Sequence, residues 1–203
     1  MRKEPDGPTG EVAVLDISDP RNLRVLDRKT EEKTWSYDNF ATGDIVYAFP
    51  YMKGSKKLNI YQISPEGKLR FDHSFEHPLI DGVHSFQRGD LLYLANFGSS
   101  SLFILNIKDP LNPFLVGELQ DKRMGNPSRI TIDEKNSLLW VAGYMDNIIS
   151  VIDVKNPESP QFIQAFENEY FKRVQTIAYH KECLYVGSRD SNSTIVFNVT
   201  VNS

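Results

Sequence analysis

One apolar phrase closed by a proline turn recurs along the chain at a nearly constant interval. It reads Val-Leu-Asp-Ile-Ser-Asp-Pro at residues 14–20, Ile-Leu-Asn-Ile-Lys-Asp-Pro at 104–110 and Val-Ile-Asp-Val-Lys-Asn-Pro at 151–157. The copies align on a central polar residue, and the interval between copies is about 44 to 47 residues, a length typical of propeller blades. The aligned residues are Asp16, Gln62, Asn106, Asp153 and Asn198.

A second apolar signal precedes the first by about fifteen residues and keeps its spacing. It comprises Ile45–Ala48, Leu91–Leu94, Leu138–Val141 and Cys183–Val186. Polar and proline turns divide one copy into four short strands, and no segment has helical periodicity. The sequence therefore predicts an all-β fold: a β-propeller of four-stranded antiparallel blades, with about five repeats, three of them complete.

The repeats do not coincide with the ends of the sequence. We expect a partial blade at residues 11–27, complete blades at 31–72, 76–119 and 124–166, and a partial blade at 170–203. Both partial blades bring a third strand, so they complement each other imperfectly. Residues 1–203 then form a single propeller domain that closes irregularly, or a segment of a larger propeller.

The aligned polar residues lie in strands that are apolar on both faces, as expected of sheets packed between two neighbours. We expect these side chains to be buried and hydrogen-bonded, with Asp16, Asn106 and Asp153 tying one blade to the next. A calcium site is disfavoured, because carboxylates on separate blades do not converge on one ion.

The phrases at residues 14–20 and 151–157, with Asn112-Pro113 and Ser159-Pro160 after the turns, resemble the LVIVD repeat. The copies around Gln62 and Asn198 depart from it, because neither has the acidic residue. The resemblance implies a β-propeller and a tendency to bind other molecules, as in many cell-surface proteins. It assigns no catalytic residue.

Charge and cysteine content exclude several functional classes. The net charge of −4 provides no basic surface for nucleic acid, and no apolar run is long enough for membrane insertion. Cys183 is the single cysteine, so no internal disulfide forms, and its apolar strand favours a buried, unreactive thiol. No signal peptide is visible at Met1–Gly7. The protein then stays inside the cell, or the chain is part of a longer protein, in which case the cell surface is open to it.

Candidate ligand-binding residues follow the second strands. Each aligned tyrosine or tryptophan of the second strands is followed, four positions later, by a candidate residue. These candidates are Tyr51, Phe97, Tyr144 and Arg189. In a propeller these positions share one face with the mouth of the central channel, so they predict an aromatic rim with a charged anchor. The alternative is that each ring packs between two blades.

Three further polar residues are predicted near the channel mouth. His84, Arg129 and Arg173 stand near the start of innermost strands, and we expect Arg129 and Arg173 to occupy similar places. His73, His77 and His84 match no zinc spacing and should lie apart, so we expect no metal and no cofactor.

No catalytic motif is present. The sequence favours a non-enzymatic binding or scaffolding propeller, for a protein or glycan partner at the channel-mouth face. The alternative is a propeller hydrolase or lactonase with a polar or metal site there, built from Asp81, His84, Arg129 and Arg173. An irregular ring also leaves exposed strand edges, which invite self-association.

Overall fold

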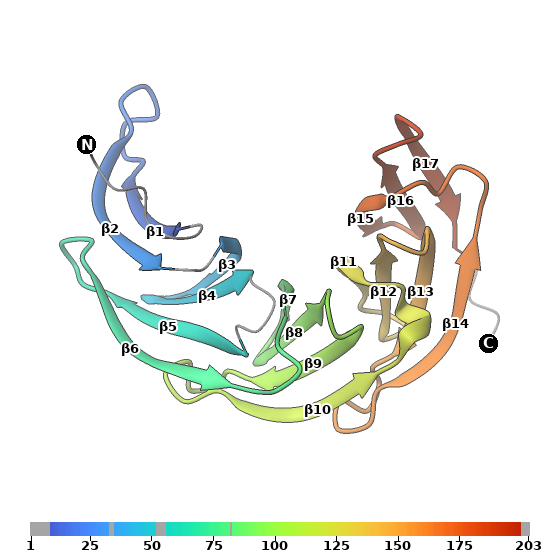
Figure 1. Ribbon diagram of the computed structural model, residues 1–203, viewed down its shortest axis with the longest axis horizontal. Coiled ribbons are helices and arrows are strands. Elements are labelled where there is room, and N and C mark those ends of the chain that lie inside the picture. Colours follow the sequence, from blue (N-terminus) through green and yellow to red (C-terminus); the bar gives the residue numbers. More distant parts are fainter. Residues whose placement is uncertain (1–8, 33–34, 52–55, 82, 200–203) are drawn as a thin grey trace. The chain divides into compact units, whose positions relative to one another are not determined.

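The computed structural model describes residues 9–32, 35–51, 56–81 and 83–199, whose regular secondary structure is almost entirely β-strand (Figure 1). The strands are β1 (Thr9–Asp16), β2 (Arg24–Glu32), β3 (Trp35–Thr42), β4 (Ile45–Tyr51), β5 (Lys57–Ile63), β6 (Leu69–Glu76), β7 (Val83–Arg88), β8 (Leu91–Asn96), β9 (Ser101–Asn106), β10 (Phe114–Gln120), β11 (Pro127–Asp133), β12 (Leu138–Gly143), β13 (Ile148–Asp153), β14 (Gln161–Glu167), β15 (Val174–His180), β16 (Cys183–Ser188) and β17 (Ser193–Asn198). One short 3₁₀ helix, η1 (Lys122–Met124), precedes β11. Within these described ranges no helix is long and apolar enough to cross a membrane.

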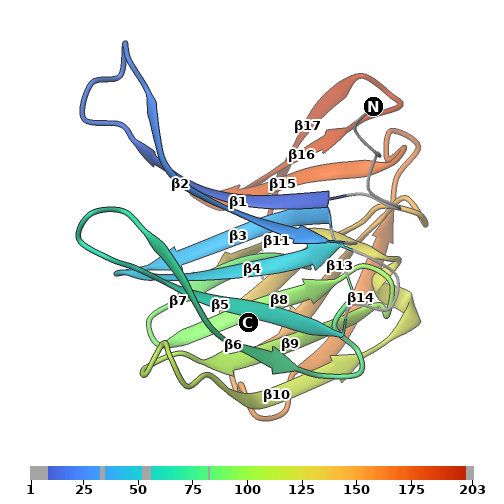
Figure 2. The ribbon, with the colours of Figure 1, turned by 60° about the vertical axis from the view of Figure 1, so that its left-hand side comes forward.

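The chain divides into two compact units. The first comprises Met1–Val83 with Asp109–Asn112, and the second His84–Lys108 with Pro113–Ser203. The first unit holds a two-stranded sheet, β1-β2, and a four-stranded sheet in the order β3-β4-β5-β6, whose strands can be followed across the sheet in Figure 2. The second unit holds four-stranded sheets in the orders β10-β9-β8-β7 and β11-β12-β13-β14, and a three-stranded sheet, β15-β16-β17.

These antiparallel sheets confirm the predicted fold class of β-propeller blades, with three complete copies flanked by partial ones. The predicted order of strands within each copy is also confirmed. Whether the whole chain forms a single domain stays a prediction.

Each unit has its own apolar core. In the first unit Val12 packs with Val46, Ala48, Tyr61 and Leu69. In the second unit one cluster lies between the sheets β7–β10 and β11–β14, and another lies between β11–β14 and β15–β17. Third strands β9 and β13 are buried on both faces, which explains their apolar sequences.

Every outermost strand carries a bulge at the same place. One residue is skipped in the pairing with the third strand, and these residues are Leu26, Asp72, Val116 and Ile163. A bulge reverses which face of the sheet the following side chains occupy. In β14, Phe162 before the bulge packs on the cluster toward β7–β10, whereas Phe166 after it stacks on Trp140.

The expectation that the aligned polar residues are buried and tie the blades together is wrong. Asp16, Asn106 and Asp153 end their strands and are partly exposed. Each accepts a hydrogen bond from the backbone N–H two residues later, at 3.0, 2.9 and 2.8 Å respectively, and so closes the turn locally. The turn lowers the pKa of Asp16 to about 2, first through hydrogen bonds from Ser18 and then through Arg24.

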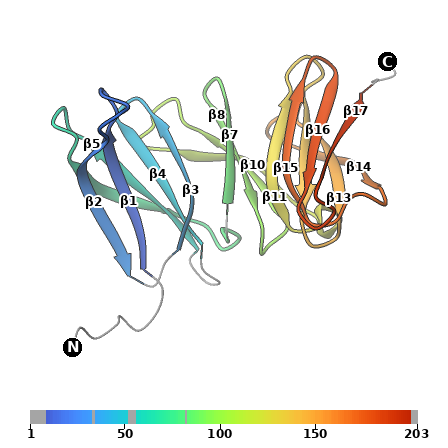
Figure 3. The same cartoon turned by 90° about the horizontal axis from the view of Figure 1, so that it is seen from above.

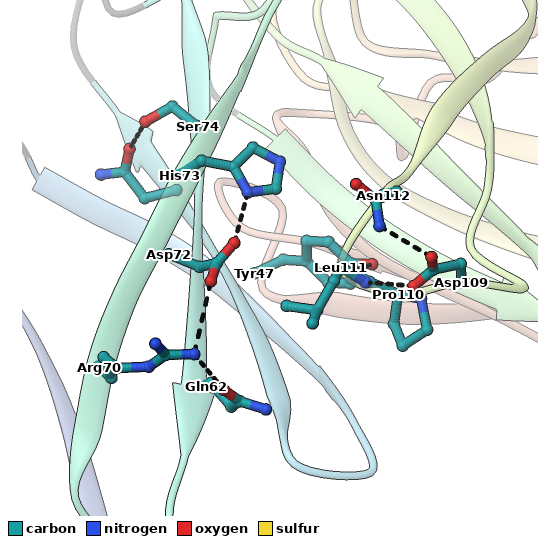
Figure 4. A network of polar contacts seen from close by, with 11 residues as sticks. Tyr47, Gln62, Arg70, Asp72, His73, Ser74, Asp109, Pro110, Leu111 and Asn112 are labelled. Carbon is teal, nitrogen blue, oxygen red and sulfur yellow. Dashed lines mark hydrogen bonds and ion pairs between the residues drawn. The ribbon is translucent and has the colours of Figure 1, made fainter.

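The turn at Asp109–Asn112 is part of the first unit, and a buried tyrosine of that unit is hydrogen-bonded to it (Figure 4). The Tyr47 hydroxyl donates a 2.6 Å hydrogen bond to the carbonyl of Pro110, and burial raises the pKa of Tyr47. On β6, which β5 separates from β4, Asp72 contacts His73 at 2.8 Å and Arg70 at 3.6 Å. His73 is therefore paired with a carboxylate on the strand surface.

Candidate functional site

The loops of the second unit that follow the second strands share one edge with the loops that precede the first strands. The Tyr144 N–H donates to the Asn126 carbonyl, and the Arg189 N–H donates to the Arg173 carbonyl, each at 3.1 Å. The first strands of these two sheets, β11 and β15, lie side by side (Figure 3). Residues far apart in the sequence therefore meet at this edge, which we call the loop face: residues 97–100, 121–126, 144–147, 168–173 and 189–192.

Four of the seven predicted site residues come together on the loop face around Tyr144. The Phe97 ring lies 6.1 Å from the Tyr144 ring, centroid to centroid, with a tilt of 57°. The Arg173 guanidinium carbon lies 5.8 Å from the centroid of the same ring, within the range of a cation–π contact. Arg189 donates to the Tyr144 hydroxyl at 3.1 Å. We call Phe97, Tyr144, Arg173 and Arg189 the Tyr144 cluster.

Tyr144 fits both interpretations of the aromatic residues, as a residue that packs between two blades and as one that a ligand can contact. Its contact with Phe97 joins the sheets β7–β10 and β11–β14, as a packing residue would. Its two arginine contacts nevertheless bring cationic groups to the ring and its hydroxyl. The ring is half-buried, so packing and ligand contact are compatible.

The charge of the Tyr144 cluster is positive. Asp190 lies 3.3 Å from Arg173 Nε and 3.8 Å from Arg189 Nε, and one carboxylate against two guanidinium groups leaves a net positive charge. The hydrogen bond to Tyr144, and then the Asp190 charge, raise the pKa of Arg189. Both arginine side chains are about half exposed, at 50% and 57%, so they remain accessible to an incoming anion.

Arg173 holds a backbone conformation that an arginine seldom adopts. Its φ is +54°, and its place in the repeat corresponds to Asn126, whose φ is +58°. Asparagine tolerates this left-handed region, whereas other side chains with a Cβ are disfavoured there. The Arg173 N–H is fixed by a 2.6 Å hydrogen bond to the Asn147 side chain. The fold therefore presents an arginine at a position suited to asparagine or glycine.

The expected equivalence of Arg129 and Arg173 is wrong by three residues. Arg129 lies inside β11, paired with Ala142, while Arg173 precedes β15. His84 lies near Arg129, because its Nδ1 accepts a 3.3 Å hydrogen bond from the N–H of the residue that follows Arg129, Ile130. An Nδ1 that accepts must be unprotonated, so neutral His84 carries its proton on Nε2. Arg129 donates to the Ser128 carbonyl at 2.9 Å.

The remaining predicted residues lie elsewhere. Tyr51 ends β4, but its side chain is outside the described residues, and its part in a rim stays a prediction. His77 Nδ1 accepts from the Leu79 N–H at 3.3 Å. In the described part of the chain, no group of three or more His, Cys, Asp or Glu side chains is placed to hold a metal ion.

The loop face also carries residues that the sequence reasoning missed. Met145 and Tyr170 are large apolar side chains that are about half exposed, at 56% and 53%. Met145 follows Tyr144 directly, and the Tyr170 carbonyl accepts a 2.9 Å hydrogen bond from Ser191. Asp190 was detectable only as the neighbour of Arg189. A repeat signal was available for Met145, because Met52 follows Tyr51 just as Met145 follows Tyr144, whereas Tyr170 has no such counterpart.

The comparisons identify the fold of the chain. No protein-family model matches the sequence, and no curated protein matches it. Among solved structures, it is similar to a protein from Lactobacillus plantarum, with a TM-score of 0.77, 18% identity, and coverage of 97% of this chain and 62% of that one. It is similar to the periplasmic gluconolactonase of Pseudomonas aeruginosa, with a TM-score of 0.78, 15% identity, and coverage of 93% and 59%.

A third similar structure is a functionally unknown protein from Desulfotomaculum acetoxidans, with a TM-score of 0.70, 18% identity, and coverage of 93% and 58%. The chain thus spans about three fifths of the length of each of these structures. At these identities the likeness establishes the propeller-type fold alone.

Proposed function

We propose that the chain is a binding module whose loop face takes an acidic segment of a partner protein. The observation that carries the proposal is the Tyr144 cluster, in which two accessible arginines meet one half-buried aromatic ring. Tyrosine, methionine and arginine are the residue types enriched in protein interfaces, and Met145 and Tyr170 extend the exposed apolar area beside the cluster.

The backbone of Arg173 supports the same proposal. A left-handed arginine costs stability, and such strain accumulates at functional positions. The arginine side chain is then retained for what it contacts. We assign Arg173 and Arg189 to the acidic group of the partner, and Tyr144 with Phe97 to its apolar part.

Titration of the protein with a glutamate-rich peptide containing one tryptophan tests the proposal, with a lysine-rich peptide of the same pattern as control. We expect Arg173→Ala with Arg189→Ala to weaken binding of the acidic peptide about tenfold or more, which corresponds to about 1.4 kcal/mol. Arg28→Ala provides the matched control, because Arg28 is 58% exposed and has one distant ion pair, to Glu11 at 3.7 Å. An equal loss in the control and in the double variant would contradict the assignment.

Asp190→Asn provides a second test with the opposite sign. The carboxylate of Asp190 competes with an incoming anion for both guanidinium groups. Its removal adds one unit of positive charge to the site, so we expect tighter binding of the acidic peptide, by a few fold at low salt. Weaker binding in this variant would mean that Asp190 itself contacts the partner.

A second candidate, sugar-lactone hydrolysis, is favoured by the likeness to the periplasmic gluconolactonase. The polar groups available to it are His84 and Arg129, on adjacent first strands. Neutral His84, protonated on Nε2, would act as a hydrogen-bond donor to a carbonyl oxygen rather than as a base. A hydrolysis assay with gluconolactone decides this: a rate above the spontaneous rate that is lost in His84→Ala would favour the enzyme.

The repeats themselves we assign to the LVIVD type. The phrases at 14–20 and 151–157 support this, because each combines the acidic residue with the proline turn. The tendency to bind partners that is associated with LVIVD-type repeats agrees with the proposed binding module.

A further inference from the structure

A polar cavity of about 590 Å³ opens on the loop face, where the sheets β7–β10 and β11–β14 meet. Both of these sheets have four strands, and both belong to the second unit. The volume falls in the range of about 300–1,000 Å³ that small-molecule sites occupy. We call it the loop-face cavity, and its lining includes Ser99, Ser100, Gln120, Lys122, Asn126 and Asp146.

Hydrogen bonds to the backbone fix the two amide side chains of the cavity. Gln120 Nε2 donates to the Ser99 carbonyl at 3.1 Å, and Asn126 Nδ2 donates to the Phe97 carbonyl at 2.9 Å. The Asn126 N–H also donates to Ser100 Oγ at 3.4 Å. Within the described residues these amides make no other side-chain hydrogen bond, so each keeps its oxygen as an acceptor, and Ser100 keeps a hydroxyl proton to donate. The cavity therefore holds donors and acceptors in place before a ligand arrives.

The two charged side chains of the cavity balance each other. In the part of the chain that the structure describes, neither the Lys122 ammonium nor the Asp146 carboxylate has a hydrogen bond or an ion pair. Both side chains are exposed, so both can contact a ligand. One positive and one negative group leave no net charge, so the lining favours neither a phosphate nor a polyamine.

The next sheet carries an equivalent cavity of different chemistry. The pairing registers place Gln120 and Glu167 at equivalent positions, and Lys122 and Glu169 follow two residues later. The two glutamates and Asp146 line this counterpart, which has a volume of about 480 Å³ and a strongly negative charge. The balanced charge of the loop-face cavity is therefore a property of its own residues and not of the repeat.

We propose that the loop-face cavity binds one or two units of a neutral carbohydrate. A sugar hydroxyl both donates and accepts, as this lining requires: the amide oxygens and Asp146 accept, whereas Lys122 donates. Among the described residues that line the cavity there is no aromatic ring and no aliphatic side chain, which disfavours a nucleobase or a lipid. Hydrogen bonds to charged groups are the stronger ones, so we assign most of the affinity to Lys122 and Asp146.

NMR titration of the ¹⁵N-labelled whole chain with maltose, cellobiose, lactose and sucrose tests the proposal. We expect at least one of these sugars to shift the amide signals of Ser99, Ser100 and Asn126, and the side-chain NH₂ signal of Gln120, in a saturable way. If none of them moves these signals at tens of millimolar, the proposal is overturned. Small shifts spread over the whole surface would overturn it as well, because the sugar would then have no specific site.

Two variants of opposite charge test the assignment of the affinity. Lys122→Ala and Asp146→Ala should each weaken sugar binding about fivefold or more, because each removes a charge-assisted hydrogen bond. Lys108→Ala is the matched control, because Lys108 is also exposed but follows β9 at the end away from the loop face. All three variants should melt at the temperature of the wild type. If both cavity variants bind the sugar as well as the control does, the proposal fails.

The double variant Arg173→Ala with Arg189→Ala distinguishes the cavity from the Tyr144 cluster. Neither arginine is among the described lining residues of the cavity, so this variant should bind the sugar as the wild type does while it loses the acidic peptide. The proposal therefore stands or falls independently of the acidic-peptide site. A double variant that loses the sugar, together with a Lys122→Ala protein that keeps it, would place the sugar at the Tyr144 cluster and overturn the proposal.

Discussion

Replacing Arg173 by glycine and by alanine separates its backbone from its side chain. Both changes remove the same guanidinium, including its ion pair to Asp190, so that contribution cancels between them. Alanine keeps a Cβ at a φ of +54° and glycine does not. Relief of left-handed strain favours glycine by about 1–2 kcal/mol, and the larger entropy of unfolded glycine opposes it by about 0.5–1 kcal/mol.

We therefore expect Arg173→Gly to be more stable than Arg173→Ala by about 0.75 kcal/mol, the middle of a range of about 0–1.5 kcal/mol. For a chain of this size that is a difference of about 1.5–3 °C in melting temperature. Both variants should lose affinity for the acidic peptide equally. Calorimetric melting together with urea unfolding measures the difference.

Ala178→Gly is the matched control, because Ala178 is an exposed residue inside β15 with ordinary strand geometry. There glycine should cost about 0.5–1 kcal/mol, opposite in sign to the difference at 173. If glycine is the less stable residue at both positions, Arg173 is not held in the left-handed region, and the argument from strain fails.

Three further predictions concern other parts of the chain. Gly117→Ala should lower stability by about 1–3 kcal/mol in urea unfolding, because an added Cβ would stand 2.1 Å from the Pro157 carbonyl oxygen. Burial, followed by the nearby Asp133 carboxylate, raises the pKa of Tyr179 to about 12; its stabilising contribution is full below pH 10, the pKa of an unperturbed tyrosine, and lost as the pH rises through 12. Burial also raises the pKa of Tyr47 and of Tyr93, so ultraviolet titration should show several late tyrosines, of which one ionises earlier in Asp133→Asn. Carboxyl NMR should find Asp16 half protonated at about pH 2, so the stability that its turn contributes is full above the ordinary aspartate pKa and is lost as the pH falls through about 2.

The sequence predicted the strands well, because two apolar signals in fixed phase reflect sheets that are buried on both faces. It placed Asp153 in the wrong environment, since a polar residue inside an apolar run can be read as buried when it in fact ends the strand. The half-exposed Asp153 closes a turn through the Lys155 N–H. Spacing alone did not distinguish these two arrangements.

The candidate site was predicted in part for a related reason. Phe97, Tyr144 and Arg189 follow second strands, and strand spacing located them. The position of Arg173 depended on where β15 begins, and the left-handed residue before that strand has no signature in a single sequence. The exposure of Met145 could not be predicted, because exposure depends on packing between sheets rather than on local pattern.

The bulge shared by the outermost strands has a consequence for how proteins of this kind gain and lose length. Because the bulge sets which side chains face the preceding sheet, an insertion of one residue there would turn the wrong face inward. Removal or duplication of a whole repeat keeps every face in register. Length changes among natural variants of this chain should therefore come in steps of one repeat, and smaller insertions should collect in the loops.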